Sequence, residues 1–260
     1  MSITPATPAT FLTAAWRWLA VLNYEIDPAL LEPLVPRGTT LDFDAAGKTY
    51  VSLVGFRFEN TRVLGWSMPG HRNFEELNLR FYVTRHEGGE ERRGVVFIKE
   101  LVPRVAISTV ARWAYNENYH TVPMRHQLTG CDSRESTRPE ANYEFYHAGA
   151  WNRLGVKCAS VSFVPDEDSH EAFILEHYWG YCRQRDGGTI EYRVDHPRWH
   201  VWPATEAVAG ADFTKLYGAS FAAILSQSPT SALLADGSPV SVAKPRRLAE
   251  ASVKSVARAS

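Results

Sequence analysis

The stretch F-E-E-L-N-L-R-F-Y-V-T-R-H-E-G-G-E-E-R-R-G-V-V-F-I-K-E-L, residues 74–101, decides the fold because it holds two strand patterns and the turn between them. Both ends of the stretch are rich in the aromatic and β-branched side chains that favour strands. The polar R-H-E-G-G-E-E-R-R at residues 85–93 is typical of a hairpin loop. The stretch therefore predicts two neighbouring strands of an antiparallel sheet.

The strand pattern continues on both sides of this hairpin. Y-V-S-L-V-G-F-R-F precedes it, and four further apolar runs follow it, separated by polar or glycine-containing turns. No interdomain linker or internal repeat interrupts them. The sequence thus predicts one mixed, mainly β domain with a few helices packed on it. The expected strands lie at residues 50–58, 141–148, 156–163, 172–181 and 189–195.

Helices are expected at only a few places. Asp27 followed by Pro28 is a good N-cap and first-turn pair for a short helix. A later helix should begin near Asp212, and residues 105–115 have a pattern that a helix could also adopt. For residues 11–22 the periodicity fits either a short helix or an entering strand, so the pattern leaves both open.

Composition limits the classes of partner. The chain has 260 residues, 45% of them hydrophobic, and a formal net charge of −1, so it can bury a sizeable core but has no basic surplus for nucleic acid or anionic membrane. We expect one domain at residues 11–243, a loose segment at 1–10 and a basic tail at 244–260. Edge strands and tryptophans would be compatible with a homo-oligomer.

The cysteines and the N-terminus suggest a reducing compartment. Cys131, Cys158 and Cys182 are odd in number and lack C-x-x-C spacing, which favours neither a disulfide framework nor a zinc site. The N-terminus has no signal-peptide pattern, and no apolar run is long enough to cross a bilayer. We therefore expect a cytoplasmic protein.

One strand of the hairpin carries a polar face. With a period of two, Glu76, Asn78, Arg80 and Tyr82 share one face, opposite Leu77 and its apolar neighbours. This face is either the water-facing side of an antiparallel strand or the lining of a cavity. In a cavity, Arg80 could hold a carboxylate and Glu76 could transfer a proton.

Lys99 is the unusual residue of the second strand. Regular alternation puts Lys99 and Phe97 on one face and Glu100 on the other. If Lys99 faced an apolar cavity, desolvation would lower its pKa and leave an amine able to form a Schiff base with a ketone. The competing interpretation lays its stem on apolar surface with the ammonium in water.

A second dense region is L-E-H-Y-W-G-Y-C, where His177 and Trp179 would share one strand face. His177 could serve in acid–base chemistry and Trp179 could contact a ligand, although aromatic strand residues more often pack in a core. There is no H-E-x-x-H or other histidine ligand spacing, so no metal is expected. The absence of G-x-G-x-x-G, Walker and G-x-S-x-G motifs argues against nucleotide cofactors and serine hydrolysis, so we expect no cofactor.

Four motifs in order carry a family resemblance. F-E-E-L-N-L-R-F-Y-V, G-V-V-F-I-K-E-L, F-I-L-E-H-Y-W-G-Y with E-Y-R-V-D-H-P-R-W, and L-L-A-D-G-S-P-V-S-V resemble the uncharacterised YqjF-like family, a domain of unknown function. The likeness runs from about Trp16 to Val242. That family is similar to a distant branch of the acetoacetate decarboxylase superfamily. The resemblance implies a closed, cone-like antiparallel β-barrel with a central cavity and flanking helices.

The resemblance also bears on mechanism. Acetoacetate decarboxylases form a Schiff base through a lysine after a proline, in a segment resembling R-E-L-x-x-Y-P-K-K. Against K-E-L-V-P-R-V here, the proline falls on Pro103 and the nucleophile position holds Arg104, while Lys99 matches the arginine before Glu-Leu. Because arginine stays protonated, it cannot act as a Schiff-base amine. The decarboxylase mechanism is therefore not inherited at that position.

Together these observations predict binding of a small anionic or oxo-acid-like molecule in a barrel cavity, with conversion by a decarboxylase- or dehydratase-type lyase reaction as the enzyme hypothesis. The alternatives are a non-catalytic binding protein, a Schiff-base decarboxylase that uses Lys99, and an interaction protein with a filled barrel. The candidate catalytic residues are Glu76, Lys99 and His177. The candidate ligand-binding residues are Arg80, Arg104, Asn78, Trp179 and Tyr82.

Overall fold

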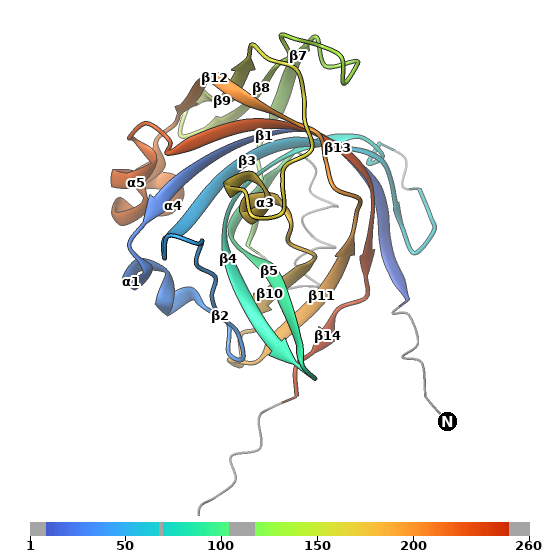
Figure 1. Cartoon of the computed structure of the whole chain (residues 1–260), viewed down its shortest axis with the longest axis vertical. Helices are drawn as coiled ribbons and strands as arrows, with labels where there is room; N and C mark the ends of the chain where they lie inside the picture. The colour runs from blue at the N-terminus through green and yellow to red at the C-terminus, as the bar shows by residue number, and fades with distance from the viewer. Residues whose placement is uncertain (1–8, 68–69, 104–117, 250–260) are drawn as a thin grey trace, which may run out of the picture.

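A computed structural model describes residues 9–67, 70–103 and 118–249. Within them, seven strands form a hydrogen-bonded ring, seen in Figure 1 as long curved strands around a common interior. The ring is closed by an antiparallel pairing of β11 with β13 and a parallel pairing of β10 with β5. In ring order the strands are β1 (Thr10–Ile26), β3 (Thr49–Val63), β4 (Phe74–Glu87), β5 (Glu90–Val102), β10 (Trp179–Arg183), β11 (Thr189–Asp195) and β13 (Ser231–Ala243).

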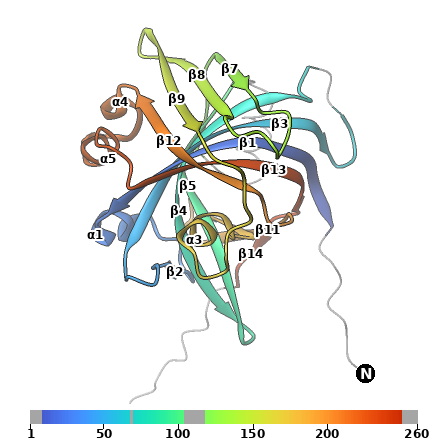
Figure 2. The same ribbon diagram turned by 45° about the horizontal axis from the view of Figure 1, so that its top comes forward.

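A second sheet leaves the ring and packs against its outside (Figure 2). It consists of β12 (Val201–Gly210), β9 (Ala150–Cys158), β8 (Glu140–His147) and β7 (Met124–Thr129), and β12 connects it to β13 of the ring. A Cβ on Gly55 of β3 would lie 2.8 Å from Tyr143 and 2.9 Å from Leu154, so glycine allows the two layers to touch. Three short strands extend the edges: β2 (Thr40–Leu41), β6 (Tyr119–Thr121) and β14 (Arg246–Arg247).

The helices are short. They are α1 (Pro28–Leu31), the 3-10 turn η1 (Glu32–Leu34), α3 (His170–Leu175), α4 (Phe213–Tyr217) and α5 (Ala219–Leu225). The predicted cap is confirmed, since the Asp27 carboxylate accepts a hydrogen bond from the Ala29 amide at 2.9 Å. The later helix begins after Asp212 as predicted, but it breaks at Gly218, whose φ of +83° ends α4. None of the helices in the described ranges has the length and apolarity needed to span a membrane.

Two hydrophobic layers result from this arrangement. One lies inside the ring, where the inward side chains of the ring strands meet Phe173, Ile174 and Leu175 of α3. The other lies between the outer face of the ring, the second sheet and helices α4 and α5. Strand residues of the ring therefore bury both of their faces, which explains why β3 and β4 are almost continuously buried.

Several predictions from the sequence need correction. Residues 172–181 are not one strand: Ser169 caps α3 by accepting from the Ala172 amide at 3.2 Å, and β10 starts only at Trp179. The hairpin loop is shorter than predicted, because Gly88 and Gly89 have φ of 62° and 84° and form a two-residue turn.

Other segments also differ from their predictions. Residues 11–22, which fitted either structure, belong to strand β1. Strand β9 ends at Cys158, short of the predicted residue 163. The barrel is not wholly antiparallel, because β10 pairs with β5 in parallel. The expected helix at residues 105–115 lies outside the described residues.

Candidate functional site

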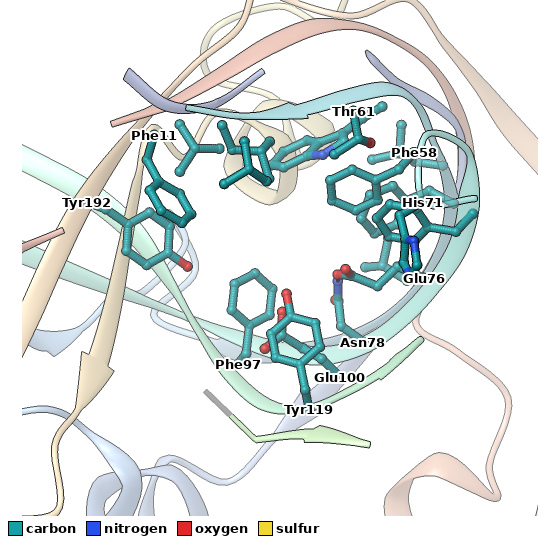
Figure 3. Close-up of a pocket in the computed structure, with 18 of the residues that line it drawn as sticks. Phe11, Phe58, Thr61, His71, Glu76, Asn78, Phe97, Glu100, Tyr119 and Tyr192 are labelled. Carbon is teal, nitrogen blue, oxygen red and sulfur yellow. The ribbon is translucent and has the colours of Figure 1, made fainter. Parts of the chain in front are cut away.

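A cavity of about 120 Å³ lies inside the ring (Figure 3). Most of its wall is aromatic or aliphatic, and a polar group of side chains lies on one side of it. This polar group consists of Glu76, Asn78, Arg80 and Glu100, and the other described lining residues with a polar tip include Thr61, His71, Tyr119 and Tyr192. The main aromatic walls are Trp16, Phe56, Phe58, Phe74 and Phe97. The interior of the barrel is thus not filled by its own side chains in the described part of the chain.

Strand β4 supplies three successive inward polar positions. Glu76, Asn78 and Arg80 have exposed fractions of 3%, 2% and 9%, and all three line the cavity. Asn78 Nδ2 donates to Glu76 Oε1 at 3.1 Å, and Arg80 Nη2 donates to the Ile174 carbonyl at 3.4 Å. Of the two interpretations left open by the sequence, the structure shows the cavity lining rather than the water-facing strand.

Two atoms of this group lack a hydrogen-bond partner within the described ranges. They are Asn78 Oδ1 and Arg80 Nε, and both are buried. An unsatisfied buried polar atom costs about 1–3 kcal/mol, and most such atoms in proteins find a partner. A ligand in the cavity would supply one, since Asn78 Oδ1 accepts a hydrogen bond and Arg80 Nε donates one.

Strand β5 contributes Glu100 and Phe97 to the cavity, but not Lys99. The expectation of regular alternation is wrong here because the register shifts by one residue: Arg80 pairs with Phe97, whereas Leu79 pairs with Lys99. Because of this bulge, Ile98 has no partner in the register with β4, and the side chains after it point to the opposite face from the one predicted. Phe97 and Glu100 therefore face the same cavity.

Lys99 lies on the opposite face of β5. Its Nζ donates to the carbonyl of Leu216 and lies 5.6 Å from the centroid of the Tyr217 ring. The Schiff-base hypothesis requires an amine with a lowered pKa that faces the cavity. Burial does lower the pKa of Lys99, but its amine is not among the groups that line the cavity. A Schiff base at Lys99 would therefore form away from Glu76 and Arg80.

Tyr82 and His177 are buried beside the cavity without lining it. The Tyr82 hydroxyl hydrogen-bonds to Ser52, and its ring stacks on His177 with centroids 4.5 Å apart. His177 Nε2 lies 3.3 Å from Asp42 Oδ2, which also accepts from Arg93 Nε at 2.8 Å. Burial lowers the pKa of His177 to about 4, so the ring is neutral near pH 7.

The other two predicted ligand-binding residues are Trp179 and Arg104, of which Trp179 does not line the cavity. The Trp179 ring lies under the Arg92 guanidinium, 4.4 Å from its Cζ, and contributes to the outer hydrophobic layer. Arg104 falls outside the described residues. Conversely, the sequence analysis missed Glu100 and Thr61 as lining residues. The only local signal for Glu100 was a carboxylate inside an apolar run.

A family described as "Uncharacterized conserved protein" matches residues 13–239. The chain belongs to this family, DUF2071. The uncharacterized protein YqjF of Bacillus subtilis (strain 168) is similar to this chain, with 27% identity over 207 residues. The alignment covers 78% of this chain and 80% of YqjF.

Solved structures similar to this DUF2071 chain are acetoacetate decarboxylase-like enzymes. The acetoacetate decarboxylase of Legionella pneumophila aligns with a TM-score of 0.62 at 13% identity, over 95% of this chain and 92% of its own. The enduracididine biosynthesis enzyme MppR, solved in complex with pyruvate, aligns with the same TM-score and identity over 95% and 93%. At such identity the likeness shows the fold alone. The mainly β, acetoacetate decarboxylase-like fold expected from the resemblance is therefore confirmed.

Proposed function

We propose that this DUF2071 protein binds a small carbonyl- or carboxyl-bearing molecule in the ring cavity and converts it by proton transfer in a lyase-type reaction. The observation that carries the proposal is the buried polar group on β4, with Asn78 Oδ1 and Arg80 Nε lacking partners in the described part of the chain. Pockets of this kind, apolar with a few convergent polar groups, are the usual form of small-molecule sites.

The chemistry of these atoms defines the head group of the ligand. Arg80 Nε donates to an oxygen of a carbonyl or carboxylate, and Asn78 Oδ1 accepts from a hydroxyl of an acid or enol. Glu76 and Glu100 also line the cavity, so two carboxyl groups lie near the Arg80 guanidinium. A carboxylate oxygen would satisfy Arg80 Nε, and a head group that also carries a donor hydroxyl would satisfy both atoms.

Glu76 is the group that we assign to the proton transfer. Asn78 Nδ2 orients its carboxyl group by donating to Oε1 at 3.1 Å, and general acid–base catalysis by a positioned carboxyl group contributes about 10²–10⁴-fold. The described cavity lining contains no lysine, so the proposed reaction proceeds without a Schiff base from these residues. The MppR complex with pyruvate supports an oxo acid as a ligand that this fold can hold.

The test compares neighbouring glutamates on one strand. Wild-type protein is titrated calorimetrically with a panel of 2-oxo, 3-oxo and hydroxy acids, and turnover of each binder is followed by proton NMR. Glu76→Gln should retain binding while turnover falls about 100-fold or more, and Arg80→Met should weaken binding. Glu75→Gln is the matched control, because Glu75 points away from the cavity and contacts His126 Nδ1 at 2.6 Å.

The outcomes separate two functions. If the wild type binds and turns over an acid and Glu76→Gln abolishes the turnover, the result supports an enzyme. If the wild type binds an acid without turning it over, the result supports the alternative of a non-catalytic binding protein. The proposal of a site at β4 is overturned if no acid binds, or if Arg80→Met and Glu75→Gln bind as well as the wild type.

A further inference from the structure

The cavity has a second polar end. Trp16 Nε1 and Thr61 Oγ1 are buried and lack hydrogen-bond partners within the described ranges, and both residues line the cavity. In the register of β1 with β3, Trp16 pairs with Phe58 and Thr13 with Arg62, and β3 holds one extra residue between Glu59 and Arg62. This bulge leaves Thr61 about two positions from Trp16, as a diagonal neighbour on the next strand. Thr61 has an exposed fraction of 6%, so water does not readily satisfy its hydroxyl.

The Trp16 ring is fixed in place by its neighbours. It makes edge contacts with Phe56, Phe58 and Trp199 at centroid distances of 5.6, 5.9 and 6.3 Å. An indole N–H can only donate, whereas a threonine hydroxyl can donate or accept. A ligand oxygen that accepts from Trp16 and shares a hydrogen bond with Thr61 would satisfy both atoms, and a hydroxyl group meets both requirements.

This end lies across the cavity from the group on β4. Figure 3 shows Thr61 on one side and Asn78 with Glu100 on the other. Phe56 pairs with Glu76, and Thr61 lies five residues beyond Phe56 on β3. Because the bulge at Asn60 takes up one residue of β3, Phe56 and Thr61 are separated by about four regular steps of 3.3 Å, or about 13 Å along the strand. One small head group therefore cannot reach both ends.

The region between the two ends is aromatic. Phe58 and Phe74 stack with centroids 4.6 Å apart and planes 10° apart, and Phe97 faces into the same space from the other wall. A volume of about 120 Å³ corresponds to roughly 8–12 water-sized groups, since one water needs about 10–15 Å³ by this measure. That space fits one six-membered ring with two short substituents.

We infer that the ligand is a single-ring aryl acid or enol that carries a hydroxyl opposite its head group, with the hydroxyl at Trp16 and Thr61 and the ring between the phenylalanines. This inference rests on the proposed function, because it takes the carbonyl or carboxyl head to lie at Arg80. Aromatic stacking favours a planar ring in such a wall. The hydroxyl then selects among ring compounds of equal size.

The test uses two probes that differ by one hydroxyl: 3-phenylpropanoate and 3-(4-hydroxyphenyl)propanoate, titrated calorimetrically into the full chain at pH 7. The wild type should bind the hydroxylated probe about tenfold more tightly, the equivalent of roughly one well-made hydrogen bond. Thr61→Val removes the hydroxyl without changing side-chain size, and should abolish this preference while leaving the affinity for the other probe within about twofold.

Three further variants control the experiment. Trp16→Phe should reduce the preference as Thr61→Val does, which keeps the test valid if one variant folds poorly. Arg80→Met should lower the affinity for both probes equally, because Arg80 lies at the head-group end of the cavity and not at the hydroxyl end. Thr205→Val is the matched control, since Thr205 is exposed on β12 and bonds to the Lys157 carbonyl.

The failures are distinguishable. If both probes bind the wild type equally, or if Thr61→Val keeps the preference, the hydroxyl end is refuted while the site at Arg80 stands, provided Arg80→Met weakens both. If neither probe binds and no acid of the wider panel binds, the proposed function fails together with this inference.

Discussion

Replacing His177 with phenylalanine should remove much of the dependence of the free energy of unfolding on pH between 7 and 5. His177 has an exposed fraction of 6%, and its ring stacks on Tyr82. Burial is the main cause that lowers its pKa to about 4; the hydrogen bond to Asp42 raises it, and the charge of Arg93 lowers it. Phenylalanine keeps the stacked ring but cannot titrate.

The direction and size of this pH dependence follow from the linkage between proton binding and folding. The pKa of His177 in the folded state, about 4, lies below the ordinary histidine value of 6.5, so between these values the unfolded chain binds a proton that the folded chain does not. Acidification therefore destabilises the wild type, by about 2 kcal/mol from pH 7 to 5 and by about 3 kcal/mol once pH 4 is passed. The variant lacks this titrating group, so its free energy of unfolding, relative to that of the wild type, should rise by about 2 kcal/mol as the pH falls from 7 to 5.

The assay is urea denaturation followed by tryptophan fluorescence at pH 7, 6 and 5. His86→Phe is the control, because the His86 side chain is 72% exposed and lies 3.6 Å from Glu91, away from the buried layer around His177. The change in slope caused by His177→Phe should exceed that caused by His86→Phe. Equal slopes for His177→Phe and the wild type would refute the reasoning. His177 would then titrate in the folded protein and would be available for the acid–base role that the sequence predicted.

Two further predictions concern charges away from the cavity. Glu191→Gln should lower the free energy of unfolding by about 3 kcal/mol in a urea titration, because a carboxylate with an exposed fraction of 1% accepts hydrogen bonds from three arginines, which would then share the single charge of Glu87. A change below about 1 kcal/mol would show that Glu87 alone compensates the arginines. Borohydride treatment with a bound oxo acid should leave Lys99 unlabelled in peptide mass spectra, since its amine lies on the face of β5 opposite the cavity, and a reduced adduct there would contradict the assigned orientation.

Strand β4 shows which part of the site could be predicted from sequence. The register of β4 with β3 has no shift, so successive side chains of β4 point to alternate faces. The period of two therefore correctly grouped Glu76, Asn78 and Arg80 on one face. The pattern could not say what that face meets, because solvent and a cavity favour the same side chains. That answer depends on the pairing of β11 with β13, strands whose paired residues Val194 and Val242 lie far apart in sequence. No local pattern encodes such a contact.

Helix α3 shows a different limit. Its apolar residues Phe173, Ile174 and Leu175 are consecutive, a pattern that a fully buried strand and a short buried helix share. The Ser169 cap decides for the helix. A serine before an acidic and apolar run is a usable signal for the start of a helix, which the strand prediction for residues 172–181 did not use.

The bulge in β5 determines which charge enters the cavity, and so which chemistry the site can support. A regular strand would have placed Lys99 inside with Phe97 and sent Glu100 into the outer apolar layer. The shifted register instead gives Lys99 the carbonyl of Leu216 near the end of α4, a favourable place for a cation, and adds a second carboxyl group to the lining that holds Glu76. Two carboxyl groups beside one guanidinium suit the exchange of protons with a bound carbonyl compound, whereas covalent capture of a ketone requires the amine that the bulge has turned away.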